Sequence, residues 1–576
     1  MKVFILLSLC TISFGIMAQK IQYPSTQKVN QSDNYFGTII EDPYRWLEDD
    51  TAKNTAAWVV EENKVTQSYF EQIPFRNKLH KRLSELWNYP KYSAPEKNGE
   101  YFTFYKNNGL QNQALLYVQK GIKGLPEVLI DPNKLSIDGT VALQATAFSK
   151  KQRYFAYAVS ASGSDWQEIN ILDFNTKKLL SDKIEYVKFT GMSWVGDDGF
   201  YYSGYSKPKE EKTKYSAKTE YQKVFYHKVG TTQEEDMLIY EDKEHPLRYV
   251  GAGVTEDERF LILSIAEGTD GSEIKIKDLQ DKSATGFITL VQGFSTNADV
   301  VDNIGDKILL KTNSAAPNYK LVLADPKNPS EANWKSIIPE TKEPLTFATT
   351  GGNKIFAGYL KDANTLVNQH DLSGKLEHSI QLPGVGTAVG FGSKKEDKEF
   401  YYIFTSFTYP ATIFKYDIAS GKSTLYRKAE VKFNPENFET RQVFYPSKDG
   451  TKVPMFITYK KGLVLNGSNP AMLYAYGGFN INITPAFSVA NIPFIENGGI
   501  YCVANLRGGG EYGEEWHKAG MLQNKQNVFD DFIAAAEYLI KEKYTSSAKL
   551  AIKGGSNGGL LVGACLTQRP DLFKVA

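Results

Sequence analysis

The sequence predicts a seven-bladed β-propeller followed by an α/β domain whose sheet is doubly wound and mostly parallel. A strand pattern that recurs every 45 to 60 residues between residues 89 and 432 predicts the propeller. Beyond residue 442, strands alternate with helices, which is typical of a parallel sheet. The chain has 576 residues, more than the ~250–300 that one hydrophobic core can hold, so at least two domains are expected.

The first 18 residues are typical of a secretory signal peptide. Lys2 precedes an apolar run that starts at Val3, and small residues lead up to Ala18. A buried strand and a membrane anchor are the alternatives, but the run is shorter than the roughly 20 apolar residues that a membrane-spanning helix needs. We therefore expect an exported protein, periplasmic or extracellular, without a stable membrane anchor.

Two helices are expected between the signal peptide and the propeller. Residues 51–72 have apolar side chains at helical spacing. Residues 76–87 do so too, with three leucines on one face. Both segments are interpreted as helices that pack against other parts of the protein.

The propeller prediction depends on a repeated unit, a polar turn followed by a short apolar strand and, in most repeats, by a second strand. The first strands start at Tyr101, Tyr154, Phe200, Phe260, Ile308, Ile355 and Phe400. A β-repeat of this length is the size of one propeller blade, which buries little surface alone and must stack on its neighbours. A β-sandwich is the alternative, but sandwiches rarely need so long a stretch of strands. Seven repeats predict seven blades.

The α/β domain is predicted from three strands, at residues 471–476, 500–504 and 550–552, with helices between them. Such strands form a parallel sheet that helices cover on both faces. Residues 527–541 fit an amphipathic helix. Its inward side chains should be Phe529, Phe532, Ile533, Ala536 and Ile540.

Ser556 is the candidate nucleophile. It lies in the pattern Gly554-x-Ser556-x-Gly558, directly after the third strand and before a helix of small residues. This is the context of a nucleophile elbow, a turn so tight that side chains at the flanking positions would clash. A purely structural glycine-rich turn is the alternative. The strand–turn–helix context favours a serine that attacks a carbonyl carbon.

A serine nucleophile needs donors for the negative charge that develops on the carbonyl oxygen. The backbone N–H of Asn557 supplies one donor in a nucleophile elbow. The loop after the first strand lies where the second donor is expected, and Tyr476 could offer its phenolic O–H there. Tyr476 and Phe479 could equally be ordinary aromatic residues at a strand end.

Composition argues against other classes of function. The chain has 67 Lys and Arg against 66 Asp and Glu and no basic block, so nucleic acid is not an expected partner. No His, Cys and carboxylate set has metal-ligand spacing, and we expect neither metal nor cofactor. Cys502 and Cys565, which remain after signal removal, are expected to be buried thiols.

Four segments carry a resemblance to a known family: residues 42–49, 476–480, 505–513 and 554–561. Together they resemble prolyl oligopeptidase, and the match runs from about Tyr23 to the last residue. Asn557 after the nucleophile and Phe479-Asn480 after the glycine pair separate the chain from sister oligopeptidases that cut after basic residues or remove acylated termini.

The resemblance implies a fold and an activity. Residues 19–88 and 433–576 would form an α/β-hydrolase domain, with the propeller of residues 89–432 inserted as a cap over the active site. The family cleaves short peptides, not folded proteins, on the carboxyl side of proline. We expect a monomer.

The same resemblance implies roles for single residues. Tyr476 and Asn557 would be the oxyanion donors, and Phe479 a wall of the pocket that receives the proline. Phe189, in the propeller, would line the site from the cap side. In this fold the catalytic order is Ser, then Asp or Glu, then His, so His517, which precedes Ser556, should be structural. Asp571 should cap a turn.

One departure from the family concerns the end of the chain. The sequence ends 20 residues after Ser556 (576 − 556), before the positions at which the family carries its catalytic Asp and His. We therefore expect a C-terminally truncated, essentially inactive fragment of a serine peptidase, whose Asp and His lie beyond residue 576. A peptide-binding pseudoenzyme and a secreted propeller scaffold with a vestigial hydrolase half are the alternatives.

Overall fold

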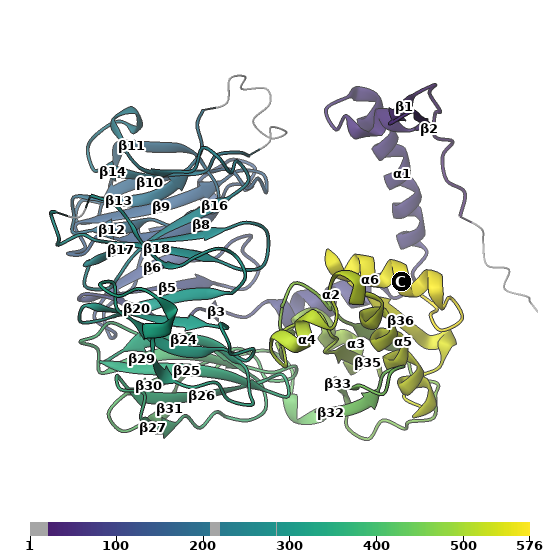
Figure 1. Ribbon diagram of the computed structural model, residues 1–576. Helices are drawn as coiled ribbons and strands as arrows, with labels where there is room; N and C mark the ends of the chain where they lie inside the picture. Colours follow the sequence, from purple (N-terminus) through teal and green to yellow (C-terminus); the bar gives the residue numbers. More distant parts are fainter. Residues whose placement is uncertain (1–20, 208–218, 284) are drawn as a thin grey trace, which may run out of the picture. The chain divides into compact units, whose positions relative to one another are not determined.

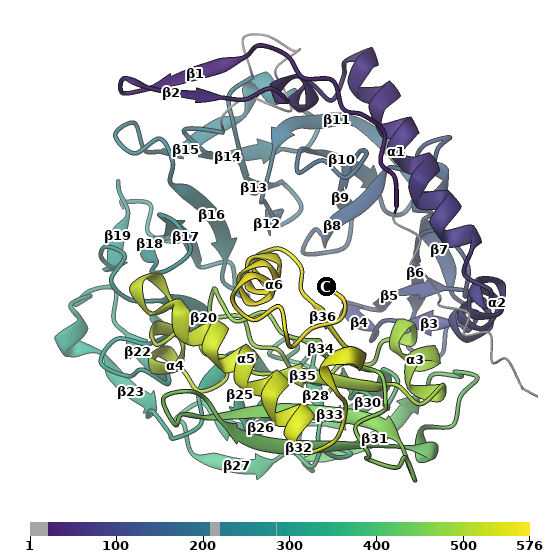
Figure 2. The same ribbon diagram turned by 90° about the vertical axis from the view of Figure 1, so that its right-hand side faces the viewer.

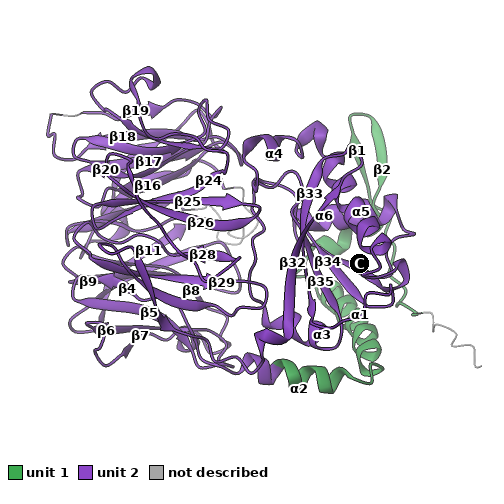
Figure 3. Ribbon diagram, turned by 90° about the horizontal axis from the view of Figure 1, so that it is seen from below, with its two compact units in different colours: residues 1–83 green, residues 84–576 purple. Residues whose placement is uncertain are grey.

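The computed structural model describes residues 21–207, 219–283 and 285–576. The chain divides into two compact units, residues 1–83 and 84–576, which Figure 3 colours separately. The predicted signal peptide, residues 1–18, lies outside the described residues. Among the helices that the structure describes, none has both the length and the apolar character to cross a membrane.

The first unit contains a short hairpin and the two predicted helices. Its elements are β1 (Ser32–Tyr35), β2 (Thr38–Glu41), η1 (Arg45–Glu48), α1 (Lys53–Glu71) and most of α2 (Arg76–Trp87). Arg45 forms an ion pair with Asp42 at 2.6 Å and a second one with Asp33. The assignment of residues 19–88 to the hydrolase domain stays a prediction. Leu86, which lies in the second unit, is fully buried against a cluster that includes Phe438 and Ile492.

Residues 91–427 form six antiparallel sheets in the described part of the chain (Figures 1 and 2). The first contains β3 (Lys91–Tyr92), β4 (Glu96–Asn98), β5 (Tyr101–Asn107), β6 (Leu115–Lys120) and β7 (Glu127–Ile130). The second contains β8 (Ala142–Phe148), β9 (Tyr154–Ser160), β10 (Gln167–Asp173), β11 (Lys178–Val187), β12 (Ser193–Val195), β13 (Gly199–Gly204), β14 (Lys223–Lys228) and β15 (Met237–Glu241).

Four sheets of four strands follow. The first of them contains β16 (Tyr249–Val254), β17 (Phe260–Ala266), β18 (Glu273–Asp278) and β19 (Ile288–Val291), and the second contains β20 (Ala298–Ile304), β21 (Lys307–Thr312), β22 (Lys320–Ala324) and β23 (Lys335–Ile338). The third contains β24 (Leu345–Gly351), β25 (Lys354–Lys361), β26 (Asn364–Asp371) and β27 (Leu376–Ser379). The fourth contains β28 (Thr387–Val389), β29 (Glu399–Thr405), β30 (Thr412–Asp417) and β31 (Lys422–Arg427). Short 3₁₀ turns are η2 (Pro132–Lys134), η4 (Gln233–Glu235), η5 (Glu331–Asn333) and η6 (Pro435–Asn437).

These sheets confirm a β-propeller. Each of the seven predicted strand starts lies within one residue of the start of a strand. The sheets surround a common centre in Figure 2. Clusters of buried apolar side chains lie between neighbouring sheets. One such cluster joins Phe260 and Ile276 of one sheet to Ile308 and Val322 of the next. Each sheet is therefore stabilised mainly by the sheets on either side.

The eight-stranded sheet has a weak joint between β11 and β13, which pair only at Val187 and Gly204. A buried polar cluster lies across this joint. The imidazole of His227, on β14, is 3.1 Å from the carboxylate of Asp182 on β11 and 2.7 Å from that of Asp236. Tyr202 donates to the second oxygen of Asp236 at 2.6 Å. His227 thus connects the two halves of the sheet.

The α/β part contains a five-stranded sheet in the order β32-β33-β35-β34-β36. Its strands are β32 (Phe438–Pro446), β33 (Lys452–Lys460), β34 (Ala471–Tyr474), β35 (Ile500–Ala504) and β36 (Leu550–Lys553). The pairs β34–β35 and β34–β36 are parallel, as predicted. The prediction of a mostly parallel sheet is nevertheless wrong for the other half, because β32 and β33 form an antiparallel hairpin and β33 pairs antiparallel with β35.

Helices cover both faces of this sheet. They are α3 (Ile492–Glu496), α4 (Glu514–Lys518), α5 (Gln526–Lys541) and α6 (Asn557–Gln568), with the 3₁₀ turns η7 (Val489–Asn491), η8 (Leu522–Asn524) and η9 (Ser547–Lys549). The crossover through α3 leads from β34 to β35 on one side, and the crossover through α5 leads back past β34 to β36. Since such crossovers are right-handed, α3 and α5 lie on opposite faces.

Helix α5 buries a different set of side chains from the one predicted. Phe532 and Ala536 are buried, as expected, but Phe529, Ile533 and Ile540 are only half-buried. The other residues that the helix buries are Val528, Asp531, Ala535 and Leu539. The buried face of the helix thus includes Asp531, whose carboxylate pairs with Arg507. The spacing of apolar residues could not indicate this ion pair.

Candidate active site

Ser556 lies in the turn between β36 and α6, with backbone angles φ +54° and ψ −120°. Non-glycine residues rarely adopt such angles, and residues that do are found most often at functional sites. A Cβ atom on Gly554 would lie 2.1 Å from the carbonyl oxygen of Gly558, so a side chain there could not be accommodated. The predicted strand–turn–helix geometry is therefore present, and the Ser556 side chain is exposed.

The turn lies beside the loop that follows β34, because β34 and β36 are adjacent parallel strands. The chain leaves β34 toward α3 on one face, whereas it leaves β36 into α6, which packs on α5 on the other face. Adjacent strands whose connections diverge in this way open a crevice at their carboxyl ends, where α/β proteins bind ligands. The candidate nucleophile stands at that edge.

Asn557 and Tyr476 meet at this edge. The side-chain amide of Asn557 donates to the backbone carbonyl of Tyr476 at 2.6 Å. The backbone N–H of Asn557 opens α6, where N–H groups have no partner within the helix and can bind an anion. The structure thus brings Ser556 and Asn557 next to the backbone of Tyr476.

Lys525 is a fourth member of this group, and no sequence pattern indicated it. Its ammonium nitrogen lies 2.7 Å from the carbonyl oxygen of Gly477 and 3.2 Å from the side-chain oxygen of Asn557. The residue is half-buried, and burial lowers the pKa of its ammonium group. A single lysine between polar neighbours gives no sequence signal for such a position.

The two predicted pocket aromatics are both exposed. Phe479 follows the glycine pair after β34 at φ +54°, and 53% of its surface is accessible. Phe189 follows β11 at φ +50° and is 57% accessible. Its ring packs edge-on against Tyr249 at 5.8 Å, so its aromatic contacts in the described residues lie within the propeller.

His517 and Asp571 are not directed at Ser556. His517 is buried, and its Nδ1 lies 2.8 Å from the carbonyl oxygen of Gly508. It supports the loop that carries Phe479, because Asn480 N–H donates to the same carbonyl at 3.1 Å. Asp571 pairs with Arg569 at 2.8 Å, and this contact lowers the pKa of Asp571.

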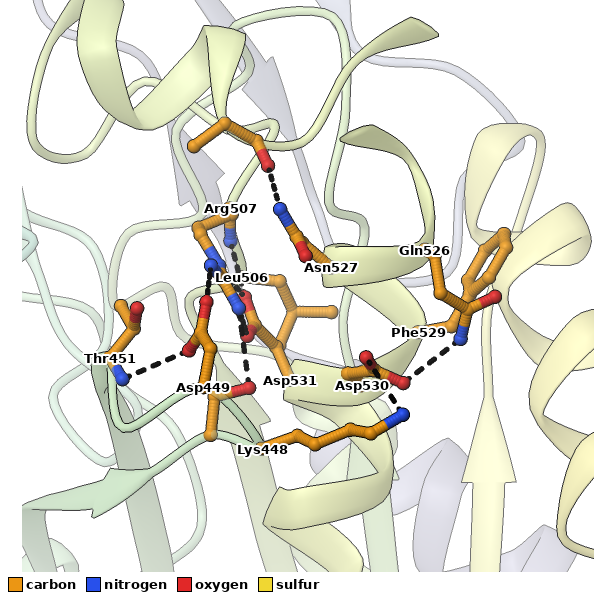
Figure 4. A network of polar contacts seen from close by, with 12 residues as sticks. Lys448, Asp449, Thr451, Leu506, Arg507, Gln526, Asn527, Phe529, Asp530 and Asp531 are labelled. Atoms are coloured by element: carbon orange, nitrogen blue, oxygen red, sulfur yellow. Dashed lines mark hydrogen bonds and ion pairs between the residues drawn. The ribbon is translucent and has the colours of Figure 1, made fainter. Parts of the chain in front are cut away.

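A buried ion pair anchors the loop after β35 (Figure 4). The Nε of Arg507 donates to Asp531 of α5 at 3.0 Å, and its NH1 group donates to Asp449 in the β32–β33 turn. The hydrogen bond from Arg507 lowers the pKa of Asp449 to about 2. These contacts hold residues 507–510 in a fixed loop after β35.

Glu511, in the same loop, is a buried carboxyl group with one unpaired oxygen. Its Oε1 accepts from the backbone N–H of Ile483 at 2.8 Å and from Asn505 at 3.1 Å. Its Oε2 has no hydrogen-bond partner among the described residues. Burial raises the pKa of Glu511 to about 7.

Both cysteines of the described residues are buried free thiols. This confirms the expectation of buried thiols, and burial raises the pKa of Cys565 to about 12 and that of Cys502 further. Over residues 21–207, 219–283 and 285–576, no group of three or more His, Cys, Asp or Glu side chains could hold a metal ion.

Family models match most of the chain. Residues 23–429 match the model described as the prolyl oligopeptidase N-terminal beta-propeller domain. Residues 485–576 match the model of the prolyl oligopeptidase family.

Similar proteins and solved structures agree with these matches. A prolyl endopeptidase from Elizabethkingia meningoseptica is 53% identical over 96% of this chain and 78% of its own length. Prolyl oligopeptidase A from Amanita bisporigera is 36% identical over 96% of this chain and 78% of its own. A solved prolyl endopeptidase structure superposes with a TM-score of 0.90 at 38% identity, covering 96% of this chain and 82% of the other. Prolyl oligopeptidase B from Galerina marginata, bound to a 35-residue hydrolysis and macrocyclization substrate, gives 0.88 at 32% identity, covering 95% and 80%.

Proposed function

Since this chain belongs to the prolyl oligopeptidase family and is a serine peptidase, we propose that it cleaves short peptides on the carboxyl side of proline. The observation that carries the proposal is the meeting of Ser556, Asn557 and Tyr476 at the carboxyl ends of β34 and β36. The relatives named prolyl endopeptidase support proline as the residue before the scissile bond.

In the proposed reaction, the Oγ of Ser556 attacks the carbonyl carbon of proline while a general base, a histidine in this family, takes the hydroxyl proton. The same group would pass the proton to the amine nitrogen as the C–N bond breaks, which leaves the acyl-enzyme. The negative charge on the carbonyl oxygen would be stabilised by the backbone N–H of Asn557 and the phenolic O–H of Tyr476. Water then releases the acyl group. Each such donor is worth about 100-fold or more in rate, so loss of either one should slow the reaction strongly.

Phe479 and Phe189 are proposed as substrate-binding aromatics. Phe479 follows the proposed oxyanion donor by three residues and exposes its ring, which suits a wall of a proline pocket. Phe189 is an exposed aromatic residue of the propeller, as a residue that lines the site from the cap side would be. Their substitution by alanine should raise KM for prolyl peptides.

The propeller is proposed to have seven blades. The eight-stranded sheet counts as two blades, β8–β11 and β12–β15, because β11 and β13 share a single residue pair. With the other five sheets this gives seven (2 + 5), which agrees with seven strand repeats in the sequence. We also propose that residues 19–88 and 433–576 form one hydrolase domain and that the protein acts as a monomer.

Export to the periplasm or the medium is a further part of the proposal. It is supported by the basic and apolar residues that precede Ala18. Expression with and without residues 1–18, followed by fractionation, tests it. Retention of both forms in the cytoplasm would contradict export.

The inactivity expected for the 576-residue chain stays a prediction. Its support is that Ser556 has no histidine partner in the described residues and that His517 is engaged with Gly508. Rapid prolyl cleavage by the purified 576-residue chain would show that this expectation is wrong.

The experiment that tests the proposed function is hydrolysis of a chromogenic peptide with proline before the leaving group by the product of the complete gene. We expect cleavage by the wild-type protein and none above background by Ser556→Ala. Ser468→Ala, an exposed serine of the same domain, is the matched control and should retain full activity. Equal activity of wild type and Ser556→Ala would contradict the proposal.

A further inference from the structure

We propose that Lys525 is a positioning residue of the active site, whose ammonium group holds the two oxyanion-donating segments together. The inference rests on the proposed function, because it takes the Asn557 N–H and the Tyr476 O–H as the oxyanion donors. Lys525 lies between η8 and the start of α5, far in sequence from both β34 and Ser556. It would act through its neighbours without touching substrate.

Three hydrogen bonds form the bridge. The Lys525 Nζ donates to Gly477 O at 2.7 Å and to Asn557 Oδ1 at 3.2 Å. The other end of the Asn557 amide donates to Tyr476 O at 2.6 Å. The bridge therefore joins the residue directly after the nucleophile to the second and third residues of the loop after β34.

The loop is built to receive this amide. A Cβ atom on Gly478 would lie 2.6 Å from the side-chain nitrogen of Asn557, so a larger residue would displace it. The Asn557 side chain thus packs directly on the loop, and both ends of its amide are satisfied. A displaced amide would also turn the backbone of Asn557, whose N–H is the proposed oxyanion donor.

The acceptors of Lys525 are unusual for a lysine, because both are neutral carbonyl oxygens. No carboxylate lies within ion-pair distance of it in the described part of the chain, although Lys525 is half-buried. Partial burial of a cation without a counter-ion is costly, so stability alone does not explain it. Its two acceptors belong to the segments that carry the proposed oxyanion donors, so Lys525 would hold those donors in place, and donor placement stabilises the transition state more than the ground state.

The test is steady-state kinetics of Lys525→Met, which keeps the length of the side chain and removes its charge and donors. The product of the complete gene is used. We expect kcat to fall about tenfold, less than the loss of a direct oxyanion donor, with KM changed less than about twofold. Lys525→Arg, which keeps the charge, should recover part of the lost rate. Lys541→Met, at the exposed end of α5, is the matched control and should leave both constants unchanged.

A second readout separates positioning from general support of the fold. A peptide aldehyde ending in prolinal forms a hemiacetal oxyanion with the serine, whereas the corresponding alcohol does not. We expect Lys525→Met to weaken aldehyde binding by the same factor as kcat/KM and to leave alcohol binding unchanged.

Unchanged kcat, or equal losses of aldehyde and alcohol affinity, would overturn the inference. If Lys525→Met does not fold, Lys525→Gln, which removes the charge and keeps a neutral amide donor group, is judged by the same criteria. Failure of the proposed function is recognised separately, because the wild-type protein would then not cleave prolyl peptides.

Discussion

Arg507 and Asp531 form a buried, bidentate ion pair that ties the loop after β35 to helix α5. The Asp531 carboxylate also accepts from the backbone N–H of Arg507 at 3.1 Å, so one carboxylate fixes both the side chain and the main chain of its partner. The same loop continues through Gly508 and Glu511, which contact the segment after Tyr476. The ion pair therefore stabilises the loop after β35, which in turn contacts the segment that follows Tyr476 at the candidate active site.

Removal of one partner should destabilise the protein strongly. Asp531→Ala leaves the Arg507 guanidinium buried beside one remaining carboxylate, and we expect the free energy of unfolding to fall by about 3–5 kcal/mol. Urea denaturation measures it. Asp530→Ala is the matched control. Asp530 is the neighbouring residue, it is half-buried, and its ion pair with the exposed Lys448 is a long one, at 3.7 Å. Its effect should stay within about 1 kcal/mol. Equal effects of the two substitutions would refute this assignment.

Glu511 should make the protein less stable as pH rises. The unfolded carboxyl ionises near 4.5, whereas the buried one keeps its proton until about pH 7. Stability is therefore lost between these values and stays constant above them. Glu511→Gln can keep the acceptor for Ile483 and should be more stable than wild type at pH 8 by up to about 3 kcal/mol. Urea denaturation at pH 5 and pH 8 tests it, with exposed Glu515→Gln as the control. A less stable Glu511→Gln at pH 8 would contradict the prediction.

His227 should also make the protein less stable as pH rises, but because a buried cation loses its proton and not because a buried acid does. Burial alone lowers its pKa, but the hydrogen bonds and charges of Asp236 and Asp182 outweigh burial and raise it. Its stabilising effect is then complete below the ordinary histidine pKa of about 6.5 and is lost as pH rises through the folded value. We expect His227→Gln to cost about 3 kcal/mol at pH 6 and less at higher pH. Calorimetry over this range measures the difference, and His245→Gln, on a partly exposed turn, is the control. A cost that grows with pH would count against a charged imidazole.

Two glycines around the elbow should respond in opposite directions to alanine. Gly563 is exposed on α6, and apart from its chain neighbours and the adjacent backbone of the helix no atom lies within 4 Å of where its Cβ would stand, so Gly563→Ala should add about 0.5–1 kcal/mol of stability. Gly554→Ala would bring a Cβ to 2.1 Å from a backbone oxygen and should cost about 1–3 kcal/mol. Thermal unfolding of both variants decides the matter. If Gly554→Ala were as stable as wild type, the tight-turn interpretation would be wrong.

Local patterns were sufficient to predict much of this fold. The helix expected at residues 51–72 is α1 (Lys53–Glu71), and the repeated strands start where alternation predicted them. The elbow was also predictable, because strand, glycines, serine and helix are contiguous in sequence. Such features depend on backbone geometry and on side chains close together in the chain.

Features that depend on distant partners were not predictable. The antiparallel half of the sheet was missed because β33 is buried on both faces and its apolar run carries no direction. The buried face of α5 was predicted wrongly because an aspartate in an amphipathic helix is expected to face solvent. Only the partner Arg507, distant in sequence, explains why Asp531 is buried. Lys525 was missed for the same reason, since its acceptors come from residues 477 and 557.

The backbone of Ser556, at φ +54° and ψ −120°, has a consequence for how the protein evolves. A non-glycine residue in that region costs about 1–3 kcal/mol, which glycine would largely avoid. Selection for turnover and selection for a durable fold therefore act in opposite directions at this one position. A lineage released from the need to hydrolyse peptides would be expected to lose the serine early, while the glycines around it, which the turn itself requires, would persist.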